Sequence, residues 1–459
     1  MQKTASSQKC IFFFLLAFSF LLRLVRLNMG FWEDEITTVV RFARSDWLSI
    51  ITQMPYPNNH ILYTLLLKLS VTLFGEKEWS ARLPAVIIGS LTPPAVYLVF
   101  SKRFSQAASF LAGLFMALNY WAVWFSQDAR GYCGLILFGF LGVWFFSRYL
   151  EKPEWRNGIL YVLAAGIAVQ FHLYGIFIVA AQLLWTVFVM AKKRKFEDAS
   201  VLALCAAAFG LGLYAMAAGQ LYKYTTSDAR EIAQIKYLNF ALGPVLLRLL
   251  MMLAGTKTII FCALLLLLSL PGMLKLLKVW PAFSAIYLAS AVLAIAFTAV
   301  AKVFIFPRFL FYLAPFFLIS LGLSVELIGN LVSGRVAKLS LYFLTAGIVC
   351  AMLIPSLINY YRVGKENYKQ AAIYISQKFP GREVITNRKA FTYYMPNATI
   401  LSQKSGPTPE IVRGKLILVR RLGWENYDNQ AVKDICRTEK RWDSAGFEEH
   451  SIILLDCSK

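Results

Sequence analysis

Long apolar segments separated by short polar stretches make up most of the first 360 residues. Each segment approaches the roughly 20 residues that an α-helix needs to cross a bilayer. The pattern therefore predicts an all-α polytopic membrane protein with about 11 transmembrane helices. The predicted spans cover residues 11–28, 82–100, 106–125, 131–150, 158–171, 174–191, 199–220, 258–274, 281–301, 308–328 and 340–358.

Two further apolar segments, 60–75 and 238–255, contain residues that suit the membrane interface. Lys68 lies in the middle of the first, and the second contains Pro244 and Arg248. If 60–75 crossed the bilayer, the basic pair at 102–103 would move to the outer side, against the rule that basic loops stay in the cytoplasm. Both segments are therefore predicted to lie in the outer interface, with spanning as the open alternative.

The same basic clusters predict the orientation of the chain in a cytoplasmic membrane, with the N-terminus inside. Residues 1–358 then form a transmembrane domain with two external loops, 29–81 and 221–257. Residues 359–459 form an external α/β domain, because one helical pattern is followed by short strand patterns such as KLILV and SIILLDC. Cys436 and Cys457 could pair in an oxidising compartment, and two unpaired thiols fit the sequence equally well.

Composition supports the membrane assignment and limits the interpretation of charge. Hydrophobic residues make up 58% of the 459 residues and charged residues 16%, against roughly 45–50% and about 25% in soluble proteins. The net charge of +22 fits basic cytoplasmic loops and sites for anionic lipid or phosphate. Without a basic tail or an aromatic–basic soluble module, no nucleic-acid partner is expected.

Unusual polar residues gather at the predicted outer face. The first external loop contains FWEDEITT, in which Glu33, Asp34 and Glu35 follow one another beside two aromatic residues. A solvated acidic turn is the simplest reading, and a catalytic carboxylate with a raised pKa is the functional one. The other polar residues at this level are His60, Arg82, Asp128, Arg130, His172, Lys302 and Arg308.

Such a collection near lipid is costly and indicates a functional site. A carboxylate can activate an incoming hydroxyl as general base, while arginine and lysine hold a departing phosphate. For each residue a structural role competes: Arg82 as a helix-end side chain in the interface, and each histidine as a hydrogen-bonded interface residue.

The order of these motifs resembles the GT-C superfamily of integral-membrane glycosyltransferases. An acidic pair follows the first span, and then come NNH, ARLP, QDARGY, HLYG and PRFL in turn. The branch it resembles comprises the protein O-mannosyltransferases, the lipid A aminoarabinose transferases and bacterial RgtA/B/C/D-like members. The resemblance covers roughly residues 10–360 and implies a polyprenyl-phosphate sugar donor, used on the outer face with inversion at the anomeric carbon.

The resemblance also implies roles for individual residues. Asp34 would be the general base, and Glu35 would orient the acceptor or share the charge. Arg82 and Arg308 would support the lipid phosphate or the acidic pair, with help from Arg130 and Lys302. Many relatives have HPP where this chain has His60-Ile61-Leu62, which places a role for His60 in question, and Glu33 adds a third acid beside the proposed base.

No cofactor is expected to be required. Clustered carboxylates attract divalent cations, but relatives in this branch do not in general depend on a metal. The acceptor, whether lipid, polysaccharide or protein, is open. The alternative function is a transporter or flippase of polyprenyl-linked sugars, which would need charges spread in depth and broken helices in repeated halves. A scaffold that presents the C-terminal domain would leave the outer polar residues unexplained.

Overall fold

A computed structural model describes residues 2–54, 59–193, 197–220, 242–301, 305–401, 408–420, 434–446 and 451–458. The chain divides into two compact units. The first comprises residues 1–25, 42–75 and 80–357, and the second comprises 26–41, 76–79 and 358–459. The first external loop thus contributes to both units, and the acidic turn belongs to the second.

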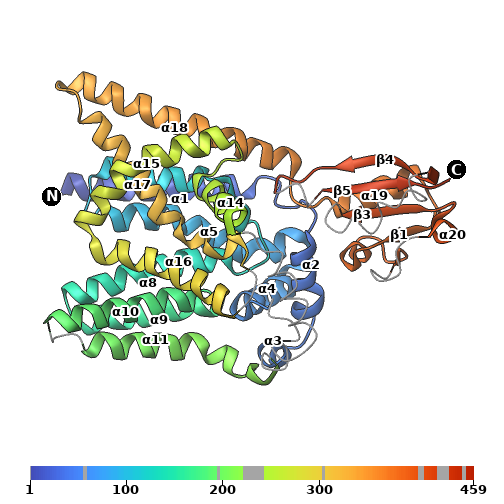
Figure 1. Cartoon of the computed structure of the whole chain (residues 1–459), viewed down its shortest axis with the longest axis horizontal. Coiled ribbons are helices and arrows are strands. Elements are labelled where there is room, and N and C mark those ends of the chain that lie inside the picture. Colours follow the sequence, from blue (N-terminus) through green and yellow to red (C-terminus); the bar gives the residue numbers. More distant parts are fainter. Residues whose placement is uncertain are drawn as a thin grey trace. The chain divides into compact units, whose positions relative to one another are not determined.

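The first unit is a bundle of helices (Figure 1). Its apolar helices follow the predicted segments because long runs of Leu, Phe, Ala and Val satisfy both helix formation and a lipid surrounding. Short helices lie between the longer ones in the first half of the chain. The helices are α1 (Gln2–Leu24), α3 (Trp47–Thr52), α4 (Ile61–Phe74), α5 (Glu78–Phe100), α6 (Gln106–Leu118), α7 (Tyr120–Ser126), α8 (Tyr132–Glu151), α9 (Trp155–Phe171), α10 (Gly175–Lys193), α11 (Glu197–Ala215), α14 (Leu242–Ala254), α15 (Ile259–Val279), α16 (Pro281–Ala301), the 3₁₀ helix η2 (Pro307–Leu313), α17 (Ala314–Gly329) and α18 (Arg335–Val363).

Among the described residues, eight helices are long and apolar enough to cross a membrane. A ninth span results if α6 and α7, which meet at a bend of 61°, count as one. All eleven predicted segments fall on helices; α9 has 17 residues and α10 has 19. The protein is therefore a multi-pass membrane protein.

The two doubtful segments form helices shorter than a span, α4 and α14. In α4, the Lys68 ammonium donates hydrogen bonds to the carbonyl oxygens of Ala43 (3.2 Å) and Ser45 (2.6 Å). Ala43 is the last residue of the short π-helix η1 (Val39–Ala43), and Ser45 follows it. The charge in the middle of the apolar segment is therefore satisfied by backbone carbonyls. The position of α4 and α14 in the outer interface stays a prediction.

Close helix packing in the first unit depends on small residues. A Cβ added to Gly272 of α15 would lie 1.9 Å from the Ser320 carbonyl oxygen of α17, and the Gly272 N–H donates to Ser324 Oγ at 2.8 Å. Small residues at such crossings allow backbones to approach where no hydrophobic effect drives association.

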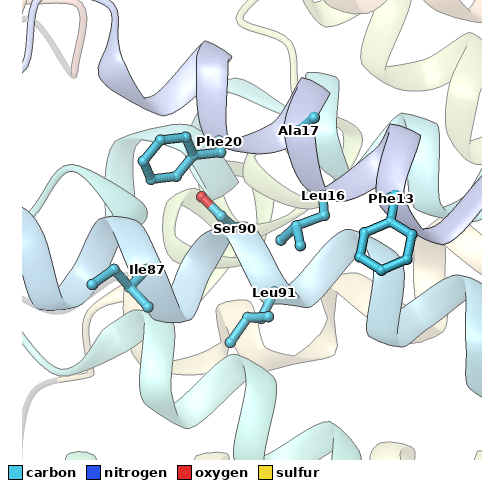
Figure 2. A pocket seen from close by; sticks show the side chains of 7 residues that line it. All are labelled: Phe13, Leu16, Ala17, Phe20, Ile87, Ser90 and Leu91. Atoms are coloured by element: carbon cyan, nitrogen blue, oxygen red, sulfur yellow. The ribbon is translucent and has the colours of Figure 1, made fainter.

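An apolar groove lies between α1 and α5 in the first unit (Figure 2). It has a volume of about 520 Å³ and is lined by Phe13, Leu16, Ala17 and Phe20 from α1 and by Ile87, Ser90 and Leu91 from α5. A smaller groove of about 270 Å³ lies between α4 and α5 and shares Ile87. The surfaces that line the two grooves are almost entirely apolar, which suits the hydrocarbon chains of lipids.

The second unit is built on a five-stranded sheet with the strand order β2-β1-β3-β5-β4. Strands β1, β2 and β3 are parallel, and β5 pairs antiparallel with both β3 and β4. The central β3 is completely buried, as expected for a short run of Leu, Ile and Val. Its elements are α2 (Glu33–Thr38), α19 (Tyr368–Lys378), β1 (Val384–Thr386), η3 (Lys389–Tyr393), β2 (Thr399–Ile400), α20 (Pro409–Val412), β3 (Leu416–Arg420), β4 (Arg437–Trp442) and β5 (Ile452–Asp456).

A disulfide joins Cys436 and Cys457, the two cysteines whose pairing the sequence left open. Cys436 comes just before β4 and Cys457 just after β5, so the bond closes one end of this antiparallel pair. The 21-residue separation corresponds to a stabilisation of about 3 kcal/mol in the chain-entropy account. The bond thus strengthens a small sheet with a limited core of its own.

Candidate functional site

The acidic turn opens helix α2 within the second unit. Glu35 is buried, and its Oε2 accepts a hydrogen bond from the Trp32 N–H (3.2 Å). The Glu33 N–H donates to Glu366 Oε2 at 2.9 Å, so a residue more than 300 positions later caps the first turn. Carboxylates are favoured here because the N–H groups of a first helical turn have no intrahelical partners.

Cations from residues 358–459 pair with Glu33 and Glu35 of the turn. The Lys365 ammonium lies 3.6 Å from Glu35 Oε1, and both side chains are fully buried. Glu33 pairs with Arg420 and, at 3.5 Å, with Arg388. Pairing with an opposite charge favours the ionised forms of both partners, while removal from water disfavours them.

A second pair connects Arg420 to Glu366, with 3.2 Å between Nη2 and Oε1. Burial raises the pKa of the Glu33 carboxyl and Glu366 raises it further, while Arg420 and Arg388 oppose this change. Burial disfavours the charge of Arg420, but Glu366 and Glu33 raise its pKa above the usual range. Glu33, Glu366, Arg388 and Arg420 therefore form one interacting group around the start of α2.

Asp34 lies between Glu33 and Glu35 in the sequence. Its side chain is half-buried, and its carbonyl oxygen accepts a hydrogen bond from Thr38 Oγ1 at 3.0 Å. The Asp34 carboxylate interacts electrostatically with both Glu33 and Arg420. It is thus part of the same charged group.

Within the first unit, His60 and Arg130 form a second polar cluster. His60 Nδ1 is 3.0 Å from the Phe171 carbonyl oxygen, which can only accept, so Nδ1 carries the proton. His60 Nε2, 2.7 Å from Arg130 Nη2, then accepts a hydrogen bond from the guanidinium. A neutral imidazole of one defined tautomer thereby orients a buried arginine.

His172 and aromatic rings surround this pair. The rings of His60 and His172 are 4.8 Å apart, and Tyr132 packs against both. The Tyr174 N–H donates to His172 Nδ1 at 3.1 Å, which also defines a neutral tautomer. Burial lowers the pKa of His60 well below its usual value, and burial together with Arg130 and Arg308 lowers that of His172 to about 3.

The depressed pKa values predict that both imidazoles stay neutral between pH 5 and 8. The unfolded chain binds protons near about pH 6.5, so acidification below that value should lower the free energy of unfolding. Nitrogen-15 NMR of protein labelled at its three histidines checks this. His60→Asn and His172→Asn variants assign the signals, and titration of either resonance near pH 6.5 would contradict the expected burial.

Arg308 joins the same cluster at the start of η2. Its guanidinium lies over the Phe306 ring at 4.2 Å from the centroid, and Phe309 packs against His172 at 5.1 Å. The QDARGY turn connects the cluster to α1, because the Gln127 amide donates to the carbonyl oxygens of Arg23 (2.7 Å) and Val25 (2.8 Å). This side chain satisfies carbonyls at the end of α1 that have no partners within the helix.

The remaining predicted residues occupy defined places in the first unit or lie outside the described residues. Asp128 is fully buried, and its carbonyl oxygen accepts from the Arg130 N–H at 2.6 Å. Arg82 is fully buried near the start of α5. Lys302 lies outside the described residues. The structure thus brings His60, Arg130, His172 and Arg308 together in one unit and places Asp34 and Glu35 in the other.

Solved structures with similar backbones cover nearly the whole chain. ArnT from Cupriavidus metallidurans in the apo state is 13% identical, with 98% of each chain covered and a TM-score of 0.57. The same protein bound to undecaprenyl phosphate is 12% identical, with 97% of each chain covered and a TM-score of 0.55. The oligosaccharyltransferase AglB from Archaeoglobus fulgidus, in complex with an inhibitory peptide and a dolichol-phosphate, is 13% identical; 86% of this chain and 64% of that one are covered, with a TM-score of 0.54.

The chain has a GT-C fold. The sequence profile of a family described as dolichyl-phosphate-mannose-protein mannosyltransferase matches residues 58–218. No curated protein matches the chain by sequence. The GT-C fold and its small C-terminal α/β region agree with the predicted fold class.

Several polar residues of the chain were not singled out by the sequence. Lys365, Glu366, Arg388 and Arg420 have the pattern of ordinary surface charges in a soluble domain. Their partners in the acidic turn are more than 300 residues away, and no local periodicity indicates such a pairing. Arg23 is a further buried cation, with its guanidinium on Ser19 Oγ at 2.6 Å.

Among the residues that the structure describes, no group of three or more His, Cys, Asp or Glu could hold a metal ion. The acidic turn has lysine and arginine partners instead.

Proposed function

We propose that the chain is an inverting glycosyltransferase. It transfers a sugar from a polyprenyl-phosphate donor to an acceptor hydroxyl on the outer face of the cytoplasmic membrane. The observation that carries this proposal is the acidic turn on α2, directly after the first span, in a chain that shares its fold over 97% of its length with an ArnT structure bound to undecaprenyl phosphate.

In this mechanism Asp34 takes the proton from the acceptor hydroxyl as the acceptor oxygen attacks the anomeric carbon. The bond between that carbon and the phosphate oxygen breaks, and the polyprenyl phosphate leaves with the electron pair. Attack opposite the leaving group inverts the configuration. Glu35, held by Lys365, keeps its place beside the base.

Cationic side chains stabilise the departing phosphate, a task that needs fixed positive charge where negative charge develops. Arg130, oriented by His60, and Arg308 are assigned this role, with Arg82 and Lys302 in support. Asp128 and His172 are assigned to binding of the substrate. We propose that no metal is required. The apolar grooves along α5 suit the isoprenoid chain of the donor.

The decisive experiment measures transfer by the full-length protein in proteoliposomes. A panel of radiolabelled undecaprenyl-phosphate and dolichyl-phosphate sugars is supplied, with lipid, polysaccharide and peptide acceptors. Release of polyprenyl phosphate together with a labelled acceptor product is expected, with opposite anomeric configuration in donor and product. Movement of the intact lipid-linked sugar across the bilayer, without release of polyprenyl phosphate, would replace this proposal by a flippase.

A further inference from the structure

Residues of the C-terminal region contact the acidic turn and the segment before it, and all of them belong to the second unit. Gly30 passes so close to α19 that an added Cβ would lie 2.6 Å from Lys369 Cβ. The Phe31 N–H donates to the Tyr394 hydroxyl at 2.6 Å, and that hydroxyl donates to Glu78 Oε1 at 3.1 Å. The segment before α2 is therefore fixed by backbone and side-chain contacts.

The charges around the turn are unequal in number. Among the described residues of this group, four carboxylates face three cations, which leaves one net negative charge when all are ionised. The carboxylates are Glu33, Asp34, Glu35 and Glu366, and the cations are Lys365, Arg388 and Arg420. Tyr368 of α19 also faces Glu366 and Glu33, and Glu78 pairs with Lys369 at 2.8 Å.

We propose that Arg420 and Arg388 are positioning residues, which hold the acidic turn through Glu33 and keep Asp34 ionised for its role as base. This inference rests on the proposed function for its catalytic meaning. It assigns to the C-terminal domain a part in the chemistry, and to the third acid, Glu33, the role of an anchor.

The physical reason is that water has little access to the charged groups around the turn. Arg420 has 9% of its side chain exposed and Glu366 has 1%, so water screens their charges poorly. A cation in this group favours the ionised form of each nearby carboxylate, and a second carboxylate disfavours it. Arg420 and Glu33 therefore act on the ionisation of Asp34 in opposite directions.

Site-specific carbodiimide labelling tests this without depending on activity. Carbodiimides react with protonated carboxyl groups, and tandem mass spectrometry of the purified full-length protein gives the pH midpoint of labelling at the half-buried Asp34. In Arg420→Gln the midpoint should rise by about 0.5 to 1 pH unit, and in Glu33→Gln it should fall by a similar amount. The double variant should return close to the wild-type midpoint, because both charges are lost together.

Two further variants make the result specific. Arg382→Gln removes an arginine of the same domain that pairs with Asp456 at 3.1 Å, and its midpoint should equal that of wild type. Arg388→Gln should shift the midpoint in the same direction as Arg420→Gln and keeps the test available if Arg420→Gln does not fold. Equal midpoints in all variants, or shifts of the same sign in Glu33→Gln and Arg420→Gln, would overturn the inference.

The transfer assay separates this inference from the proposed function. If both hold, the acid limb of kcat/KM moves with the labelling midpoint in each variant, whereas a merely structural role lowers the rate at every pH without moving the limb. If Arg420→Gln and Glu33→Gln shift the labelling midpoint in opposite directions but Asp34→Asn keeps full transfer activity, Asp34 is not the base. If Asp34→Asn loses most of its transfer activity but no variant shifts the labelling midpoint, only the positioning role is refuted.

Discussion

Replacing Asp34 with asparagine is expected to lower the rate of sugar transfer at least about 100-fold. Asparagine has nearly the same shape and keeps the first turn of α2 intact, but it accepts no proton from the acceptor hydroxyl. The loss should fall on kcat, because the carboxylate acts mainly in the transition state. Initial rates in proteoliposomes, at saturating donor and acceptor, provide the measurement.

Asp46→Asn is the matched control for this variant. Asp46 belongs to the same external loop and caps α3 by accepting a hydrogen bond from the Ser49 N–H at 2.9 Å. Asparagine caps a helix about as well as aspartate, so this variant should keep the wild-type rate. A rate for Asp34→Asn within a few-fold of the control would remove Asp34 from the mechanism and direct attention to Glu33 or Glu35.

Replacing Arg130 with glutamine is expected to lower transfer about 10- to 100-fold. A charge-assisted hydrogen bond contributes about 1.5–3 kcal/mol, and the guanidinium is assigned to the leaving phosphate. Arg130→Lys should recover part of the rate, because it restores the charge without the planar geometry. His60→Ala should cause a smaller loss, because Arg130 keeps its charge but loses its nitrogen acceptor.

Arg148→Gln is the control for Arg130. Arg148 lies in the last turn of α8, whereas Arg130 comes two residues before its first turn, so the two arginines occupy opposite ends of a 20-residue helix. The folded state of each variant is checked by its thermal unfolding midpoint. A rate for Arg130→Gln equal to that of Arg148→Gln, in a folded protein, would show that the His60–Arg130 pair is structural.

The sequence was most informative where a residue's neighbours in the chain decide its environment. Each predicted span became a helix because lipid and protein interior both accept long apolar runs. The C-terminal α/β region followed from short β-branched strands such as β3. Helix α9 begins at Trp155, three residues before its predicted segment, since an apolar pattern indicates a helix more reliably than it indicates where that helix begins.

The candidate site was only partly predictable. The acidic turn stands out because three consecutive carboxylates are rare beside an apolar span, and Arg130 and His172 stand out as polar residues in apolar surroundings. Arg388 and Arg420, the partners of Glu33, do not stand out in the sequence, because they lie in a region where surface arginines are common. The pairing of His60 with Arg130 depends on where the chain places the Phe171 carbonyl, which no spacing encodes.

The disulfide of the C-terminal sheet has a consequence for when the protein matures. Strand β5 has Cys457 just beyond one end, and at its other end Ile452 pairs with Arg420 of β3. Cytosolic thiols stay reduced, while exported ones oxidise. In the proposed orientation, with this domain on the outer face, the strand that pairs with Arg420 would be cross-linked only after export. Assembly of the acidic turn would then be coupled to arrival in the compartment where the proposed donor is used.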